Sequence, residues 1–385
     1  MHAALRPLRP LRTGFIAAVA LVAPLVFGTG QAQGQALPLA EIHAADDWSQ
    51  AIAEARAAVR RVMIENNVPG ASIAVGVGDA LVWSEGFGWA DIEQGTPVTP
   101  LSRFRIGSVS KTVTSTAIGL LMERGQLDLD AEVQEYVPDF PRKRWPITVR
   151  QVAGHIAGIR HYRGRENFSM VRYPDVTSGL EIFAADSLLF EPGTDYSYSS
   201  YGWNLISAVI EGASGTDFLD FMRDEVFEPL GMRSTVPEHT DSIIPHRVGY
   251  YENGIGGAVV NAPYVDNSYK WAGGGFVGTP EDLIRFGRAH MGPGILQQAT
   301  LDELMAPMTL ADGESTGYGV GWRSYPQDDG DMAVGHSGGS VGGTTLFLIV
   351  PEHDMVVAGV INVSGPAGEI VQSVARIFEQ AVRGR

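Results

Sequence analysis

The chain has 385 residues, which suits one domain of two lobes, and its side chains give a formal net charge of −16 at pH 7. It contains no cysteine, which excludes disulfides, a thiol nucleophile, Cys-ligated zinc and iron–sulfur clusters. The acidic balance, with no basic stretch outside the N-terminus, argues against nucleic acid as a partner.

Residues 1–36 have the order of a secretory signal peptide. Three arginines precede an apolar run over 14–27, and small residues follow, with cleavage predicted near 32–36. The apolar run is short for a bilayer span, so we expect a secreted or periplasmic protein with no stable membrane anchor after cleavage. An organelle transit peptide is the alternative, which the continuous apolar centre disfavours.

The first elements after this segment are a helix and a hairpin. Apolar residues recur at helical spacing over 46–67. The β-prone runs 71–77 and 80–90 are joined by Gly78 and Asp79, which favour a tight turn. We therefore expect a helix followed by two antiparallel strands.

The middle of the chain, 105–310, shows mainly helical patterns, for example over 110–124 and 203–212. Four β-prone runs then begin at Tyr318, Met332, Thr344 and Met355. An amphipathic helix is predicted over 367–382.

Strands at both ends of the chain with helices between them predict an α/β (α+β) fold. We expect a mixed, mostly antiparallel sheet that both termini complete, flanked by helices, with a largely helical lobe inserted. One catalytic domain would cover 45–385, with a sheet lobe over about 45–104 and 311–385 and a helical lobe over about 105–310. A functional site is expected in the cleft between the lobes.

The segment IGSVSK places Ser108 at the start of a predicted helix and Lys111 one turn further on the same face. A lysine with a lowered pKa can take the proton of a serine and make it a nucleophile. The N–H groups of the helix start can bind a developing oxyanion. An S-x-x-K match occurs by chance about once in a chain of this length, so Ser108 as a mere helix cap stays open.

A second segment, PGTDYSYSSYG, delivers Tyr198, Ser199 and Ser200 just before another predicted helix. A tyrosine in such a loop can hold or transfer a proton beside an ammonium group. An aromatic packing cluster with Tyr196 and Tyr201 is the alternative.

A third segment, GHSGGSVGG, lies on a late predicted strand and contains His336. Small residues on a strand allow a substrate backbone to lie alongside, and a free N–H there can form an oxyanion pair with that of Ser108. A structural histidine is equally compatible with this pattern.

The order S-x-x-K, Y-x-[NS] and H-x-G resembles the serine β-lactamase and penicillin-binding superfamily. The most similar branch holds class C β-lactamases, D-alanyl-D-alanine peptidases and related esterases. The segments GIRHY and NAPYVDNSYKWAGGGF are similar to the mitochondrial serine β-lactamase-like proteases, of which the chain looks like a bacterial relative.

This resemblance implies that Ser108 is acylated and that Lys111 and Tyr198 act as general base and general acid, with their order left open. It also implies a substrate-binding and oxyanion group of Ser200, His336, Gly338 and Gly339. In that group the N–H of Gly339 would join the N–H of Ser108.

Two residues depart from the usual pattern of the superfamily. Ser200 replaces an asparagine, whose amide both donates and accepts hydrogen bonds at longer reach. His336 replaces a lysine that binds the substrate carboxylate, so we expect a positive charge that depends on pH. Both changes weaken the case for β-lactam hydrolysis.

Other candidates have weaker support. His155 and His161 lack a carboxylate at a metal-binding spacing, so we interpret them as packing and loop-fixing residues, with no metal site. Tyr264, Asp266 and Lys270 either shape substrate entry or are structural.

The sequence thus predicts a serine hydrolase without metal or cofactor that cleaves peptide, amide or ester bonds of a peptide or small-molecule substrate. A β-lactamase or D-alanyl-D-alanine carboxypeptidase acting on cell-wall-like substrates is one alternative. A non-catalytic member that binds ligands or forms filaments is another, and a homo-oligomer is left open.

Overall fold

The computed structural model describes residues 42–385 except 328–329. The predicted signal peptide, residues 1–36, lies outside the described residues. Among the residues described, no helix is both long enough and apolar enough to cross a bilayer.

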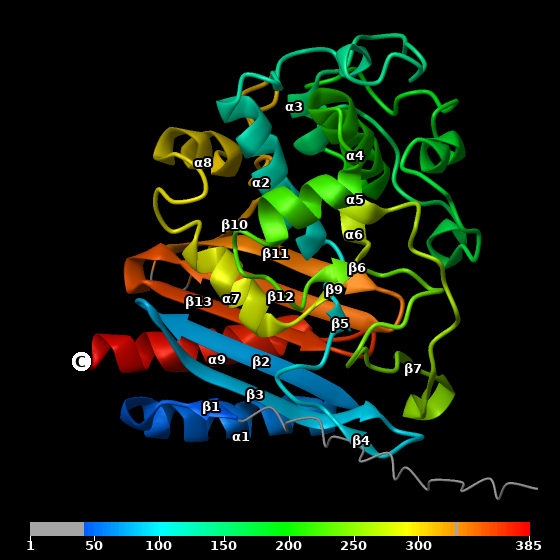
Figure 1. Cartoon of the computed structure of the whole chain (residues 1–385). Coiled ribbons are helices and arrows are strands. Elements are labelled where there is room, and N and C mark those ends of the chain that lie inside the picture. Colours follow the sequence, from blue (N-terminus) through cyan, green and yellow to red (C-terminus); the bar gives the residue numbers. More distant parts are fainter. Residues whose placement is uncertain (1–41, 328–329) are drawn as a thin grey trace, which may run out of the picture. The chain divides into compact units, whose positions relative to one another are not determined.

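One antiparallel sheet, built from both ends of the described chain, is the centre of the fold (Figure 1). Its strand order is β1-β3-β2-β13-β12-β11-β10, with β4 paired to β3. The strands are β1 (His43–Ala44), β2 (Gly70–Val77), β3 (Ala80–Asp91), β4 (Thr96–Pro97), β10 (Arg323–Pro326), β11 (Met332–Ser340), β12 (Gly343–Val350) and β13 (Met355–Ile361). The predicted fold class is confirmed, although the pairs of this sheet are all antiparallel rather than mixed.

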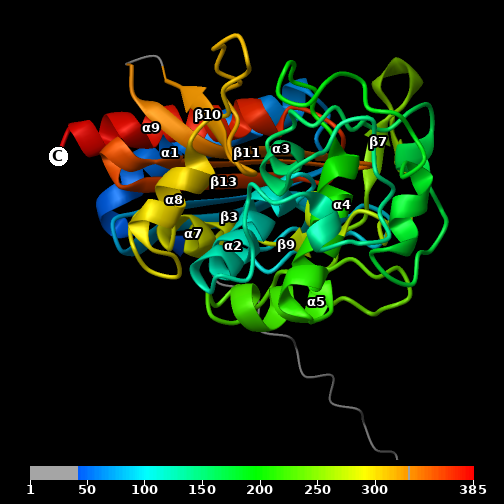
Figure 2. The same cartoon turned by 90° about the horizontal axis from the view of Figure 1, so that it is seen from above.

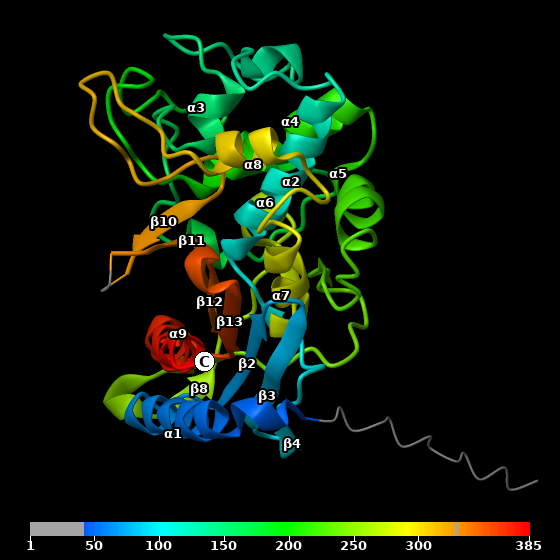
Figure 3. The same ribbon diagram turned by 90° about the vertical axis from the view of Figure 1, so that its left-hand side faces the viewer.

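Helices cover both faces of this sheet, which explains why its central strand β13 is buried at every position. The helices α1 (Ser49–Glu65) and α9 (Ala367–Arg383) lie on one face (Figure 3). There the ring of Phe378 stacks on those of Trp48 and Trp83. The helices α2 (Val109–Glu123) and α7 (Pro280–Arg288) lie on the other face, between the sheet and the helical part.

The middle of the chain forms the helical part, and Figure 2 shows it from above. Its further helices are α3 (Val149–Ala153), α4 (Ser200–Ser214), α5 (Phe218–Phe221), α6 (Trp271–Gly274) and α8 (Gln298–Met305), and a π-helical turn follows α5. Two small sheets join it, formed by β5 (Phe104–Arg105), β9 (Phe276–Gly278) and β6 (Val236–Pro237), and by β7 (Tyr251–Asn253) and β8 (Val259–Asn261).

The strand predicted from Tyr318 begins only at Arg323, so this part of the prediction is wrong. A tight turn precedes the strand, in which the N–H of Gly319 donates to the carbonyl of Trp322 over 2.8 Å. Gly321 has a φ of +80°, a left-handed conformation that ends any extended run. The turn sets Arg323 at the start of the edge strand β10.

The turn before α2 is pressed against β11. Gly107 adopts a φ of +51°, which favours glycine. A Cβ atom on Gly338 would lie 2.1 Å from the carbonyl oxygen of Ile106 and 3.2 Å from the backbone nitrogen of Ser108. Strand and turn therefore meet backbone to backbone, and this contact sets Ser108 beside Gly339.

This contact predicts different effects for two neighbouring glycines. Gly338→Ala should lower the free energy of unfolding by about 1–3 kcal/mol, because the new methyl group meets backbone that cannot move aside. Gly339→Ala should stay within about 0.5 kcal/mol of wild type, because a Cβ atom there meets nothing within 4 Å. Urea unfolding of the two variants tests this, and equal losses would contradict the proposed close approach.

Candidate active site

Ser108 and Lys111 meet at the start of α2. Ser108 occupies the N-cap position, but its hydroxyl makes no capping hydrogen bond. Instead Lys111 Nζ lies 2.9 Å from Ser108 Oγ. The three-residue spacing on a helix brings the two side chains together, as predicted.

The Lys111 amine is fully buried and surrounded by oxygen atoms. Besides Ser108 Oγ, its Nζ lies 2.7 Å from the carbonyl oxygen of Gly273 in α6 and 3.3 Å from Ser200 Oγ in α4. A neutral amine donates two protons and accepts one. In the neutral form, with its two protons on Gly273 and Ser200, the lone pair would face the hydroxyl of Ser108.

The surroundings of Lys111 favour the neutral amine. Burial lowers the pKa of Lys111 well below the ordinary lysine value, and the positive charge of Lys270 lowers it further. Across the described residues, no carboxylate forms an ion pair with Lys111. The side chain therefore has the electrostatics of a base.

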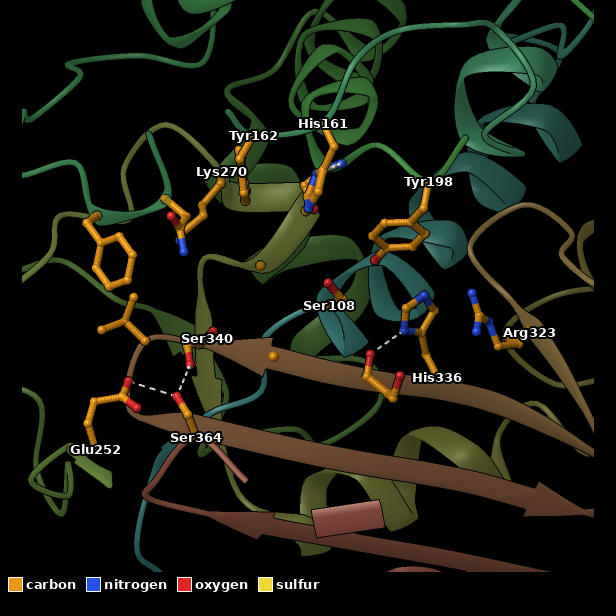
Figure 4. A pocket seen from close by; sticks show the side chains of 18 residues that line it. Ser108, His161, Tyr162, Tyr198, Glu252, Lys270, Arg323, His336, Ser340 and Ser364 are labelled. Atoms are coloured by element: carbon orange, nitrogen blue, oxygen red, sulfur yellow. Dashed lines mark hydrogen bonds between the residues drawn. The ribbon is translucent and has the colours of Figure 1, made fainter. Parts of the chain in front are cut away.

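Tyr198 comes from the loop before α4, and its hydroxyl points toward Ser108 (Figure 4). Burial raises the pKa of the Tyr198 phenol, and a hydrogen bond with Ser108 acts in the opposite direction. The ring centroid lies 5.0 Å from Lys111 Nζ. Tyr198 is thus a protonated phenol between Ser108 and the side of the cavity that holds His336.

Two histidines hold the loop of Tyr198 in place. The N–H of Ser199 donates to Nδ1 of His155 over 3.1 Å, and the N–H of Ser200 donates to Nδ1 of His161 over 3.1 Å. The ring of His155 also packs on that of Tyr198, with centroids 4.2 Å apart. Their predicted packing and loop-fixing roles are confirmed, and His161 in addition lines the cavity.

His336 lies on β11 as a neutral ring. Its Nε2 accepts from the hydroxyl of Tyr318 over 2.8 Å, and its Nδ1 donates to the carbonyl of Ser337. Burial lowers the pKa of His336 to about 3. The ring is therefore uncharged at neutral pH, because the fold desolvates it. The guanidinium of Arg323 supplies the cation at this end (Figure 4).

These residues surround a cavity of about 680 Å³ between the helical part and the edge of the sheet. The predicted residues that line it are Ser108, Tyr198, Ser200, His336 and Gly339. Gly338 does not line it, because its role is the close contact with the turn before α2. Lys111 lies behind Ser108. Residues that the motifs did not single out also line it, among them Tyr162, Phe168, Glu252 and Arg323.

For Lys270, Asp266 and Tyr264 the sequence left two roles open, shaping substrate entry or supporting the structure. The structure places the three residues differently. Lys270 lines the cavity and is almost fully buried. Asp266 is buried and accepts hydrogen bonds from Thr240 Oγ1 and from the N–H of Ser268, both over 2.9 Å, which is a structural role. Tyr264 is 60% exposed and lies outside the cavity lining.

The sheet, the helical part and the cluster of Ser108, Lys111 and Tyr198 together have the architecture of the β-lactamase and transpeptidase type. A family model described as Beta-lactamase matches residues 55–381, and the chain belongs to this family. Members of the family include β-lactamases, penicillin-binding proteins and a D-aminopeptidase, and family members are serine hydrolases.

Relatives and solved structures agree with this assignment. The human mitochondrial serine beta-lactamase-like protein LACTB is 30% identical, over 86% of this chain and 77% of the relative. The octameric penicillin-binding protein homologue from Pyrococcus abyssi is 25% identical, with a TM-score of 0.75 over 86% of this chain and 77% of that one. A D-stereospecific amidohydrolase from Streptomyces is 25% identical, with a TM-score of 0.70 over 82% of this chain and 97% of that one.

The neutral His336 predicts a specific dependence of stability on pH. Below about pH 6.5 the unfolded chain protonates this histidine, whereas the folded chain does not until about pH 3, so stability falls as the pH drops between them. Between pH 8 and pH 5 the free energy of unfolding should therefore fall by about 2 kcal/mol less in His336→Gln than in wild type. Urea unfolding at both pH values measures this. Parallel losses in wild type and variant would show that His336 is charged in the fold.

Proposed function

We propose that the protein is an acyl-serine hydrolase that cleaves peptide, amide or ester bonds through an acyl-enzyme on Ser108. The observation that carries this proposal is the buried Lys111 amine, whose nitrogen lies 2.9 Å from Ser108 Oγ without a carboxylate partner in the described part of the chain. A desolvated neutral amine at this distance is a competent general base.

The site contains a residue for each step of the proposed acyl transfer. Lys111 takes the hydroxyl proton while Ser108 Oγ attacks the substrate carbonyl, and the oxyanion receives hydrogen bonds from the N–H groups of Ser108 and Gly339. Tyr198, protonated in the free protein, donates its proton to the leaving group and regains one from Lys111. Water then hydrolyses the acyl-enzyme and restores Ser108. The high pKa of Tyr198 supports Lys111, rather than the phenol, as the first base.

Two features support peptide, amide or ester substrates over β-lactams. The Ser200 hydroxyl is already a partner of Lys111 Nζ, and it has no amide to offer a substrate. His336 is neutral and therefore lacks the charge that a lysine would present there.

A carboxypeptidase is the second candidate, because Arg323 places a cation on the same side of Ser108 as Tyr198 (Figure 4). Its guanidinium lies 3.5 Å from the hydroxyl of Tyr196, and no carboxylate pairs with it among the described residues. A free C-terminal carboxylate on the leaving group would complement this charge. Faster cleavage of a dipeptide than of its C-terminal amide would favour this candidate.

Three further expectations stay predictions from the sequence. Export to the periplasm or the outside rests on residues 1–36, outside the described residues. The absence of a cofactor and of a nucleic-acid partner rests on composition and motifs. A homo-oligomer or filament stays open.

The nucleophile is tested by labelling. A fluorophosphonate should add to Ser108, as seen by intact mass and peptide mapping, and a p-nitrophenyl ester should be hydrolysed. Ser108→Ala should abolish the adduct and lower hydrolysis by at least about 10³-fold. Ser110→Ala in the same helix is the control, because its hydroxyl is buried, has no partner in the described residues and lies outside the cavity. An adduct elsewhere, or equal activity of Ser108→Ala, would overturn the proposal.

The base is tested by the pH profile. Lys270→Met removes a positive charge that lowers the pKa of Lys111, so the acid limb of the phosphonylation rate should move to higher pH. Lys143→Met, which removes a lysine outside the cavity, should leave the limb in place. A limb that does not move with Lys270→Met would argue against Lys111 as the base.

A further inference from the structure

Lys270 is a second buried lysine at the cavity, and the proposed reaction gives it no chemical step. It precedes α6, is only 6% exposed and lines the cavity that holds Ser108. The rings of Tyr269 and Tyr162 flank its ammonium, with centroids 5.2 and 5.7 Å from Nζ. Such rings stabilise a cation but do not neutralise it.

The Lys270 ammonium has no anionic partner within the described residues. The nearest acid that acts on it, Glu238, binds Arg105 Nε with both oxygens, at 2.7 and 3.0 Å, and accepts from Asn267 Nδ2 over 2.6 Å. Burial, and then the charge of Arg105, lower the pKa of Lys270 to about 8, which leaves the ammonium mostly charged at neutral pH. A buried charge without a partner is unfavourable, and an anion in the cavity would relieve it.

The cavity has a second charged group on this side, Glu252, which is already engaged. Its Oε1 accepts from the N–H of Gly342 over 2.9 Å and from Ser364 Oγ over 2.8 Å. Glu252 and Ser364 lie beside the sheet, whereas Lys270 lies beside the helical part (Figure 4). An anion bound at Lys270 therefore approaches from the helical side of the cavity.

The position of Lys270 relative to Ser108 decides which part of a substrate it meets. In Figure 4, Lys270 lies on one side of Ser108, and Tyr198, His336 and Arg323 lie on the other. The leaving group must face Tyr198, which donates its proton. The acyl part of the substrate then extends toward Lys270, past the ring of Tyr162, which lines the same cavity (Figure 4).

We propose that Lys270 binds a carboxylate in the acyl part of the substrate, so that the protein prefers amides and esters whose acyl group carries an acid. This assignment rests on the proposed acyl-serine function. Tyr162, whose ring flanks Lys270, would contact the methylene groups between that carboxylate and the scissile carbonyl. Arg323 lies on the other side of Ser108, toward the leaving group, so Lys270 does not bind an acid on the leaving group.

The experiment must separate this role from the effect of Lys270 on Lys111. Removing the charge alters the base for every substrate, whereas a binding role alters only substrates with an acid on the acyl side. Mono-p-nitrophenyl esters of adipic and suberic acid provide the acid, and the same esters methylated at the far carboxyl are their neutral counterparts. A second pair consists of phenyl butyrate and 4-carboxyphenyl butyrate. Here the acidic member carries its carboxylate on the leaving group. The ratio of kcat/KM within each pair is the readout.

Wild type should hydrolyse the acidic acyl esters about tenfold or more faster, in kcat/KM, than their methylated counterparts. Lys270→Met should abolish this preference, Lys270→Glu should reverse it, and Lys270→Arg should retain it. Lys143→Met should leave the ratio at the wild-type value. The ratio for the butyrate pair should be the same in wild type and Lys270→Met.

Three results overturn the assignment while the proposed function stands. The first is a wild type that labels at Ser108 but shows no acyl-side preference, and the second is a preference that survives in Lys270→Met. The third is an equal change of the acyl-side ratio and the leaving-side ratio in Lys270→Met, because the charge of Lys270 would then act on acids on both sides of the scissile bond. If the wild type neither labels at Ser108 nor hydrolyses any ester, the proposed function fails and the Lys270 assignment fails with it.

Discussion

The burial of the Lys111 amine is the constraint on which the rest of the site depends. An ammonium in this place would need a carboxylate, and the described residues offer only the oxygens of Ser108, Ser200 and Gly273. Burial lowers the pKa of Lys111 and so favours the neutral amine, whose lone pair can act on the hydroxyl of Ser108. A structural helix cap would need none of this, so the desolvation of Lys111 favours the proposed role of Ser108 as a nucleophile over that of a helix cap.

The fold supplies that environment from three separate helices and one strand. The start of α2 carries Ser108 and Lys111, α4 brings Ser200, and α6 brings the carbonyl of Gly273. The strand β11 closes the remaining side by direct backbone contact at Gly338, which sets the Gly339 N–H beside that of Ser108. The proposed chemistry and the proposed specificity thus lie in different parts: the cluster at α2 is enclosed, whereas Lys270 and Arg323 bring their charges to the cavity wall.

Sequence patterns predicted that Ser108, Lys111 and Tyr198 lie together, because each is defined by its local sequence. Ser108 and Lys111 share a helix face, and Tyr198 directly precedes a helix. The cavity charges were harder to predict, because Lys270 and Arg323 reach the cavity only through tertiary packing. The residue type of His336 indicates a charge that depends on pH, but the pH range of that charge could not be predicted, since burial decides it. One compositional signal was present: the chain has three lysines, and two of them are buried at the site.

That small number of lysines makes the central claim directly measurable. Protein labelled with ¹³C at the lysine ε-carbon has three signals, from Lys111, Lys143 and Lys270, which the variants Lys143→Met and Lys270→Met assign. NMR titration should show Lys111 losing its proton at the lowest pH of the three, well below the ordinary lysine value of about 10.4. A Lys111 signal that titrates near that ordinary value would contradict a neutral base at Ser108.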